Sequence, residues 1–149
     1  MANYKSIKHN KIAIGVLFAL FAVLAVGLVA AMFRIDTQIH TETLTAVDYE
    51  VGSIDENEGT NVATAGSIRS KSLRSVDGLT ITLKNDANVT YKIFCYNEDG
   101  TFISWTSSLS EIPASAELFR IVVTPTESVN INIFTVKDYS GQLVVTYNK

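Results

Sequence analysis

The chain of 149 residues contains a single cysteine, Cys95. One cysteine cannot form a disulfide within the chain, and no combination of cysteine and histidine has the spacing of a metal site. Cys95 lies within an alternating apolar stretch, so we expect a small buried side chain, with an intermolecular disulfide or a reactive thiol as the alternative. The sequence therefore excludes a scaffold held together by internal disulfides.

Histidine is almost as scarce, and this bears on catalysis. His9 precedes the longest apolar stretch and His40 follows it, and no G-x-S-x-G motif accompanies either of them. Carboxylates are plentiful, but a general acid needs a raised pKa, and nothing in the sequence marks one carboxylate for burial. We therefore predict that the protein is not an enzyme.

Basic residues are few outside the N-terminal region. Residues 35–149 hold all 15 acidic residues but only 8 of the 12 lysines and arginines, whereas residues 1–34 hold the other 4 and no acidic residue. Nucleic-acid binding depends on neutralising phosphates with lysine and arginine. An acidic body without a basic cluster argues against nucleic acid as a partner.

The N-terminal region contains an apolar stretch over residues 12–33, IAIGVLFALFAVLAVGLVAAMF, without a charged side chain. A helix rising about 1.5 Å per residue spans the ~30 Å hydrocarbon layer over such a length. Lysines precede the stretch, so the positive-inside rule places the N-terminus in the cytoplasm. We predict a basic cytoplasmic tail over residues 1–11, a transmembrane signal anchor over 12–33 and a stalk over 34–42. The alternative is a cleaved signal peptide, with secretion after cleavage near Ala31.

The remainder of the chain changes to short apolar runs of period two, separated by glycine, asparagine, aspartate and serine. No part of it shows a helical period, and the stretch 53–67 is the most loop-like. Eight short strands at this spacing indicate a β-sandwich or barrel. The expected strands are 43–51, 67–75, 79–84, 89–96, 101–106, 118–124, 129–136 and 142–147.

Two motifs within these runs resemble a known class of domain. Tyr91-Lys-Ile-Phe-Cys-Tyr-Asn-Glu-Asp-Gly-Thr-Phe-Ile-Ser and Pro113-Ala-Ser-Ala-Glu-Leu-Phe-Arg-Ile are similar to segments of jelly-roll, galactose-binding-like or carbohydrate-binding-like domains. Such domains occur in Gram-positive bacterial surface proteins and phage tail proteins. The resemblance implies an all-β, antiparallel jelly-roll-like sandwich over residues 43–149. It implies little about function, because such sandwiches serve as sugar binders, adhesion modules and spacers.

Two groups of residues are candidates for a binding role. Aromatic rings stack on sugar rings while polar side chains hydrogen-bond the hydroxyls, and the candidates for this are Tyr96, Trp105, Tyr139 and Arg69. The acidic loop offers hard oxygen ligands suited to Ca²⁺, from Asp55, Glu56 and Glu58. The alternatives are core aromatics and a solvated loop without any cofactor.

Taken together, these patterns predict a non-catalytic, single-pass membrane protein that displays a binding or interaction module at the cell surface. Its expected partners are the lipid bilayer and a glycan or another cell-envelope polymer. The alternative is a structural subunit of an extracellular or membrane-associated assembly, in which the apolar helix packs against copies of itself.

Overall fold

The computed structural model describes residues 39–149, and residues His40–Lys149 form one compact unit. The predicted cytoplasmic tail, signal anchor and most of the stalk lie outside the described residues. Among residues 39–149 there is no helix of the length and apolarity needed to cross a membrane. The unit consists of open antiparallel sheets with one short α-helix, which confirms the expectation of a mainly antiparallel β fold.

The larger sheet is built around two long strands, β8 (Val89–Tyr96) and β10 (Leu118–Pro125), which pair over their whole length. β9 (Phe102–Thr106) extends the sheet on one side. On the other side β10 pairs with β5 (Ile68–Ser70) and β6 (Arg74–Ser75), and β2 (Tyr49–Val51) forms the edge beyond β5. A 3₁₀ turn, η2 (Leu109–Glu111), follows β9. β10 is therefore a central strand, in agreement with its nearly continuous apolar sequence.

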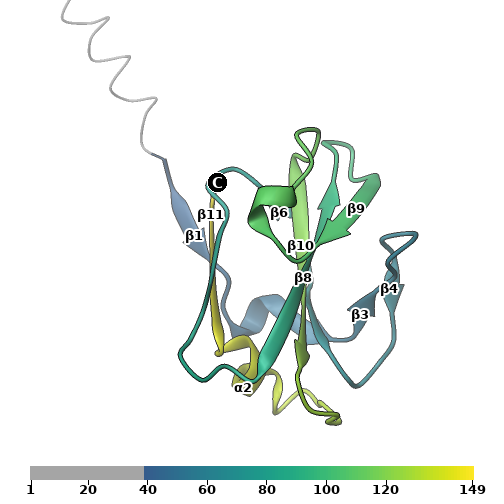
Figure 1. Cartoon of the computed structure of the whole chain (residues 1–149), viewed down its shortest axis with the longest axis vertical. Helices are drawn as coiled ribbons and strands as arrows, with labels where there is room; N and C mark the ends of the chain where they lie inside the picture. Colours follow the sequence, from purple (N-terminus) through teal and green to yellow (C-terminus); the bar gives the residue numbers. More distant parts are fainter. Residues whose placement is uncertain (1–38) are drawn as a thin grey trace, which may run out of the picture. The chain divides into compact units, whose positions relative to one another are not determined.

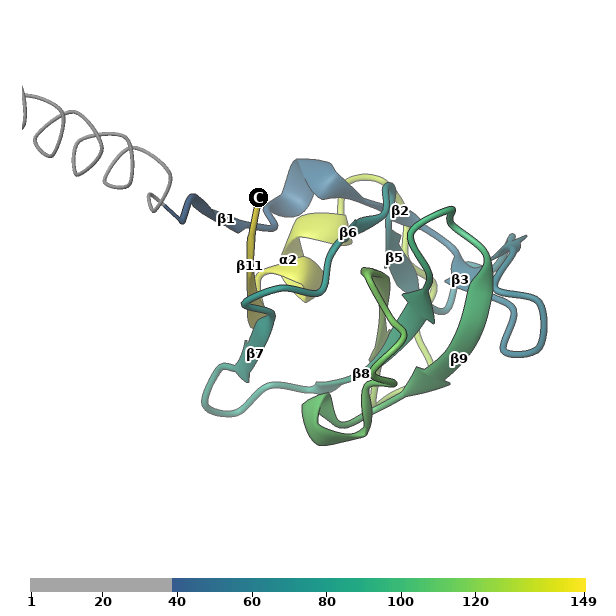
Figure 2. The same cartoon turned by 90° about the horizontal axis from the view of Figure 1, so that it is seen from above.

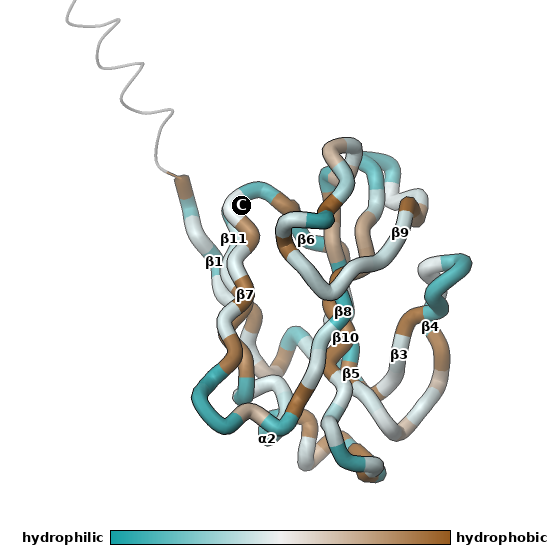
Figure 3. The backbone as a smooth tube through the Cα atoms, in the orientation of Figure 1, coloured by the Kyte–Doolittle hydropathy of each residue, from teal (hydrophilic) through white to brown (hydrophobic). Residues whose placement is uncertain are grey.

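The smaller sheet has the order β1–β11–β7, with bounds Thr41–Thr43, Leu143–Asn148 and Thr80–Leu83. The C-terminal strand β11 lies in its middle. Figures 1 and 2 show this sheet facing the larger sheet, with the helix α2 (Val136–Ser140) at one end of the space between them. Figure 3 shows the hydrophobic residues concentrated along the strands rather than in most of the loops.

The main hydrophobic cluster fills the space between the two sheets. Ile93, Ile121 and Val123 of the larger sheet are inaccessible to solvent, as is Val145 of the smaller sheet. Phe119 on β10 is also inaccessible, and its ring lies edge-on to the ring of Tyr147 on β11, with centroids 5.9 Å apart. The two sheets are therefore held together mainly by removal of apolar surface from water.

A second, smaller cluster covers the opposite face of the larger sheet. There the hairpin of β3 (Ser53–Ile54) and β4 (Asn61–Val62) packs Ile54 against Phe94 and Tyr96. Both clusters are made only of residues between 44 and 147, so residues 39–149 contain their own core.

Buried Arg120 fastens this hairpin to the larger sheet. Its Nε donates to the carbonyl oxygen of Ser70 at 2.9 Å, and its Nη1 donates to Asn61 Oδ1 at 2.6 Å. A buried guanidinium is tolerated only when its donors are hydrogen-bonded, so Arg120 and the hairpin depend on each other.

The structure corrects four parts of the predicted strand pattern. The predicted strand over 67–75 is broken after Ser70, so that β5 and β6 are separate strands. The predicted strand over 129–136 is wrong, because that segment is a turn that leads into α2. The stretch 53–67, predicted to be a loop, contains β3 and β4. The predicted strand over 43–51 is interrupted by a 3₁₀ turn, η1 (Ala46–Asp48), and β1 begins at Thr41 within the predicted stalk.

Local hydrogen bonds explain why the segment over 129–136 is not a strand. The side-chain oxygen of Asn132 accepts from the Phe134 N–H at 2.9 Å, and the Thr135 hydroxyl oxygen accepts from the Asn132 N–H at 3.0 Å. The Asn132 carbonyl also accepts from the backbone of Thr135 and Val136. Asparagine and threonine thus give this backbone a turn as an alternative to a sheet ladder.

Candidate functional site

Trp105 is the most accessible of the aromatic residues predicted to bind a sugar. It lies on β9 opposite Phe94, and 37% of its surface is exposed. The ammonium of Lys92 lies 4.0 Å from the centroid of the indole ring, and the same ammonium forms an ion pair with Glu56. This cation–π contact covers one face of the ring, so a sugar has to displace Lys92 or use the remaining exposed surface.

Tyr96 is not available at the surface. Its side chain is buried in the second cluster, and its hydroxyl donates a hydrogen bond to the carbonyl oxygen of Gly59 at 2.9 Å. Burial raises the pKa of this hydroxyl. A buried ring with a satisfied hydroxyl cannot stack on a ligand from solvent, so Tyr96 is removed from the candidate binding residues.

Arg69 and Tyr139 lie apart from Trp105 on other elements. Arg69, on β5, forms an ion pair with Glu50 at 2.7 Å and donates to the carbonyl oxygens of Ser53 and Val62. Its donors therefore hold the β3–β4 hairpin. Tyr139, on α2, is half-buried and lines a small hollow of about 290 Å³ with Pro125 and Gln142 among others. The four predicted sugar-binding residues do not form one site.

The acidic loop does not assemble a calcium site. Asp55 Oδ1 accepts hydrogen bonds from the backbone N–H groups of Asn57 and Glu58, which closes the turn between β3 and β4. Glu56 is directed to Lys92. Nowhere in residues 39–149 do three or more acidic, histidine or cysteine side chains gather as a metal site would require. The prediction of calcium ligation by Asp55, Glu56 and Glu58 is not supported by this geometry.

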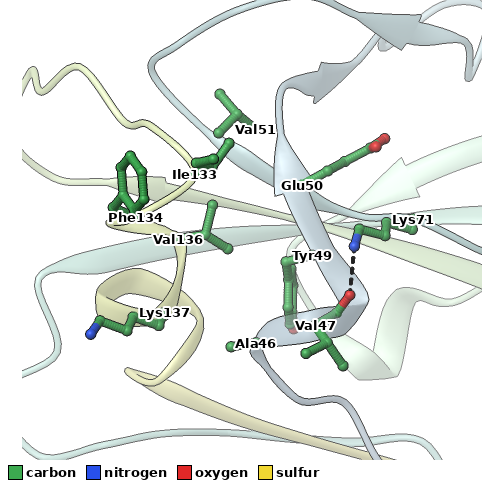
Figure 4. A pocket seen from close by; sticks show the side chains of 10 residues that line it. All are labelled: Ala46, Val47, Tyr49, Glu50, Val51, Lys71, Ile133, Phe134, Val136 and Lys137. Atoms are coloured by element: carbon green, nitrogen blue, oxygen red, sulfur yellow. Dashed lines mark hydrogen bonds between the residues drawn. The ribbon is translucent and has the colours of Figure 1, made fainter.

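The surface also contains a groove that the sequence did not indicate. It is an open hollow of about 460 Å³ between residues 46–51 on one side and 133–137 on the other, with Lys71 also lining it (Figure 4). We call it the β2–α2 groove. Three of its apolar side chains lie mostly in solvent: Val47 is 76% exposed, Ile133 is 77% exposed and Phe134 is 78% exposed.

One wall of the groove is fixed by the 3₁₀ turn η1. Thr45 and Asp48 form a capping box, in which an Asp48 carboxylate oxygen accepts from the Thr45 N–H and hydroxyl at 2.8 Å each. The Lys71 ammonium donates to the carbonyl oxygen of Val47 at 2.7 Å (Figure 4). These bonds hold Val47 at the rim of the groove, with its side chain in solvent.

The other wall of the groove is formed by residues 133–137, which include part of the turn found where the sequence predicted a strand. A strand over 129–136 would have placed Ile131 and Ile133 on the same buried face. In the structure Ile131 is buried, but Ile133 and Phe134 are directed into solvent. The sequence did contain a signal for this turn. Asn132 and Thr135 are three residues apart, so that their side chains can hydrogen-bond the nearby backbone.

The groove carries a local positive charge on an acidic domain. Lys71 and Lys137 line it, and within residues 39–149 neither forms an ion pair. Glu50, the acidic residue that lines it, is paired with Arg69. The groove therefore combines apolar side chains with two ammonium groups that form no ion pair within residues 39–149, and it offers no arrangement of a nucleophile and a base.

We expect the stability of η1, which forms this wall of the groove, to depend on pH, because the Asp48 carboxylate accepts its capping hydrogen bonds. Partial burial raises the pKa of its carboxyl, but hydrogen bonds from Thr45 and Arg74 outweigh this, and the net pKa is below the ordinary value of 3.8. The stabilisation is therefore present above the unfolded-state pKa and is lost as the pH falls through the folded-state pKa.

We expect Asp48→Asn to lower the free energy of unfolding by about 1 kcal/mol at neutral pH, because the amide loses the charge that strengthens the hydrogen bonds from Thr45 and pairs with Arg74. The difference from the wild type should shrink towards zero in strong acid. Urea unfolding at pH values above and below the ordinary pKa measures this. A difference that stays constant with pH would contradict the assignment to the carboxylate.

No protein-family model, curated protein or solved structure matches this chain. The resemblance to jelly-roll domains therefore stays a prediction from sequence motifs.

Proposed function

We propose that this protein is a non-catalytic binding module, displayed outside the cell membrane by an N-terminal signal anchor. We propose further that its β domain is a jelly-roll-like sandwich. The hydrophobic cluster shared by the two antiparallel sheets supports the sandwich assignment. The uncharged stretch over residues 12–33, preceded by lysines, supports the anchor and its orientation.

The observation that carries the proposed function is the β2–α2 groove. Val47, Ile133 and Phe134 leave about three quarters of their surface in water around one hollow. Burial of apolar surface contributes roughly 25 cal/mol per Å², so a partner that covers these side chains gains binding free energy. Apolar side chains gathered around a hollow are a typical mark of an interaction site.

A protein partner fits this groove better than a glycan does. Sugar recognition needs an open aromatic face with hydrogen-bonding side chains around it, whereas most of the side chains that line the groove are apolar. The residues predicted to bind a sugar lie elsewhere: Lys92 covers one face of Trp105, and Arg69 is engaged in structural bonds. The alternative role, a structural subunit of an assembly, rests on the same groove if it is occupied by other copies of the chain.

Display and binding can be tested together on the full chain. We expect a C-terminal tag to be accessible to protease from outside the membrane, and the N-terminus of the mature protein to be intact. A photo-crosslinking residue at position 134 should form an adduct with another polypeptide in the native membrane, whereas the same residue at Thr82, exposed on β7, should not.

Two results would overturn the proposal. A mature N-terminus near Met32 would replace the anchor with a cleaved signal peptide. Equal adduct formation from positions 134 and 82 would show that the groove is not a preferred contact surface.

A further inference from the structure

We infer that the β2–α2 groove binds an extended, acidic and apolar peptide segment of a partner protein, which adds as a strand along β2. This inference rests on the proposed binding function and makes its ligand specific. Three features of residues 39–149 support it: the outer backbone edge of β2, the apolar rim of the groove, and the two lysines there that form no ion pair.

Within residues 39–149, one backbone edge of β2 pairs with no other strand. β2 is the outermost strand of the larger sheet on its side, and its neighbour is β5. Next to the paired residues, the Gly52 N–H donates to Ser67 and the Lys71 N–H donates to the carbonyl of Asp48. Backbone groups alternate in direction along an antiparallel pair, so residues 48, 50 and 52 bond towards β5, and residues 49 and 51 point the other way.

This alternation leaves hydrogen-bonding groups on the outer edge. The Tyr49 N–H is already used, because it bonds the carbonyl oxygen of Ala46 in η1. The Tyr49 carbonyl and both backbone groups of Val51 are directed away from β5. Strand addition uses such groups for affinity and uses neighbouring pockets for the side chains of the peptide.

The side chains around this edge indicate that the peptide carries an apolar side chain. The hollow of about 460 Å³ is within the size range of ligand pockets, and Val47, Ile133 and Phe134 border it. A hollow receives an inserted apolar side chain, whereas a flat bilayer surface leaves it unfilled. The shape therefore favours a peptide over a lipid surface.

The charge around the groove indicates that the peptide also carries acidic side chains. Lys71 and Lys137 line the groove without ion pairs in residues 39–149, and the domain as a whole is acidic. Complementary charge increases the association rate and the selectivity of an interface. A segment with Asp or Glu beside its apolar side chains is the matching ligand.

The experiment is selection of a random peptide library displayed on phage against immobilised residues 39–149. We expect the enriched sequences to combine alternating apolar residues with Asp or Glu. The consensus peptide is then synthesised with a fluorophore, and its affinity is measured by fluorescence polarisation on the full chain in neutral-lipid nanodiscs.

Substitutions identify the surface that binds this peptide. Phe134→Ser should weaken binding about tenfold or more, as for an interface hot spot. Lys137→Gln should weaken it less and reduce its dependence on salt. The matched control is Leu83→Ser, an exposed apolar residue on β7, which should leave the affinity unchanged.

N-methylation of the peptide tests strand addition separately. Methyl groups on alternate backbone nitrogens should abolish binding in one register and leave it in the other, because only one set of N–H groups faces β2. Equal effects in both registers would overturn the strand geometry.

The remaining outcomes separate this inference from the proposed function. If the enriched peptides bind through Phe134 but lack acidic residues, or if their affinity is the same for Lys137→Gln as for the wild type, the acidic ligand class is wrong and the binding function still stands.

Self-association of the chain that is lost in Phe134→Ser would identify a second copy as the occupant and overturn the inference. Binding of residues 39–149 to phosphatidylglycerol vesicles with the same dependence would identify a lipid surface instead. If no peptide, vesicle or second copy binds, and position 134 gives no adduct, both proposals fail.

Discussion

Phe119→Ala is expected to lower the free energy of unfolding by about 3–5 kcal/mol, the range for removing a large aromatic side chain from a core. Phe119 lies on the central strand β10 and is inaccessible to solvent, and its ring contacts Tyr147 of the opposite sheet. The truncation removes apolar contacts and leaves a cavity between the two sheets, which the paired strands cannot readily close. Urea unfolding of residues 39–149, followed by circular dichroism, measures the effect.

Phe134→Ala is the matched control for this substitution. It removes the same atoms from a side chain that is 78% exposed, so the change in stability should stay within about 0.5 kcal/mol. Equal effects at the two positions would show that the space between the sheets is not the main source of stability.

Gly59→Ala is expected to cost about 2–4 kcal/mol, from backbone strain together with a steric clash. Gly59 has a φ of +67°, which L-residues with a side chain rarely adopt. An added Cβ would also lie 2.4 Å from Cγ of Phe102. The substitution should displace the β3–β4 hairpin, because the carbonyl of Gly59 also accepts the hydroxyl of Tyr96.

Gly66→Ala provides the control for backbone effects. Its φ is not positive, and the nearest atom to an added Cβ is the Thr64 hydroxyl oxygen at 3.8 Å. There the change should be neutral or slightly stabilising, by about 0.4–1 kcal/mol, because alanine restricts the unfolded chain. Thermal unfolding of the two variants measures both effects, and comparable losses would contradict the role given to the clash at Gly59.

The sequence was most informative where local and tertiary preferences agree. Strand β8 was predicted with its observed bounds, and the turn after it contains Asp99-Gly100, a pair typical of hairpin turns. Gly100 has a φ of +83°, as that turn requires. Ile93 and Cys95 belong to one cluster and Phe94 and Tyr96 to the other, as the alternation of side chains along a strand requires.

The candidate site was harder to predict, because exposure depends on what packs against a strand from elsewhere in the chain. Tyr96 and Trp105 have similar positions in the sequence pattern, but the turn around Gly59 covers Tyr96 and leaves Trp105 at the surface. The β2–α2 groove joins residues about 85 positions apart, and such a contact has no periodic signal in either segment.

The position of β11 has a consequence for the order in which the domain folds. β11 follows every other strand of residues 39–149 in the sequence, and it provides the partners for both β1 and β7. Its pairing with β1 joins residues more than 100 positions apart, as in the contact between Thr41 and Asn148. Contacts of this separation form slowly. A chain emerging N-terminus first can pair β8 with β10 early, but it has no partner for β1 until β11 has been synthesised. The smaller sheet therefore closes only after β11 has left the ribosome.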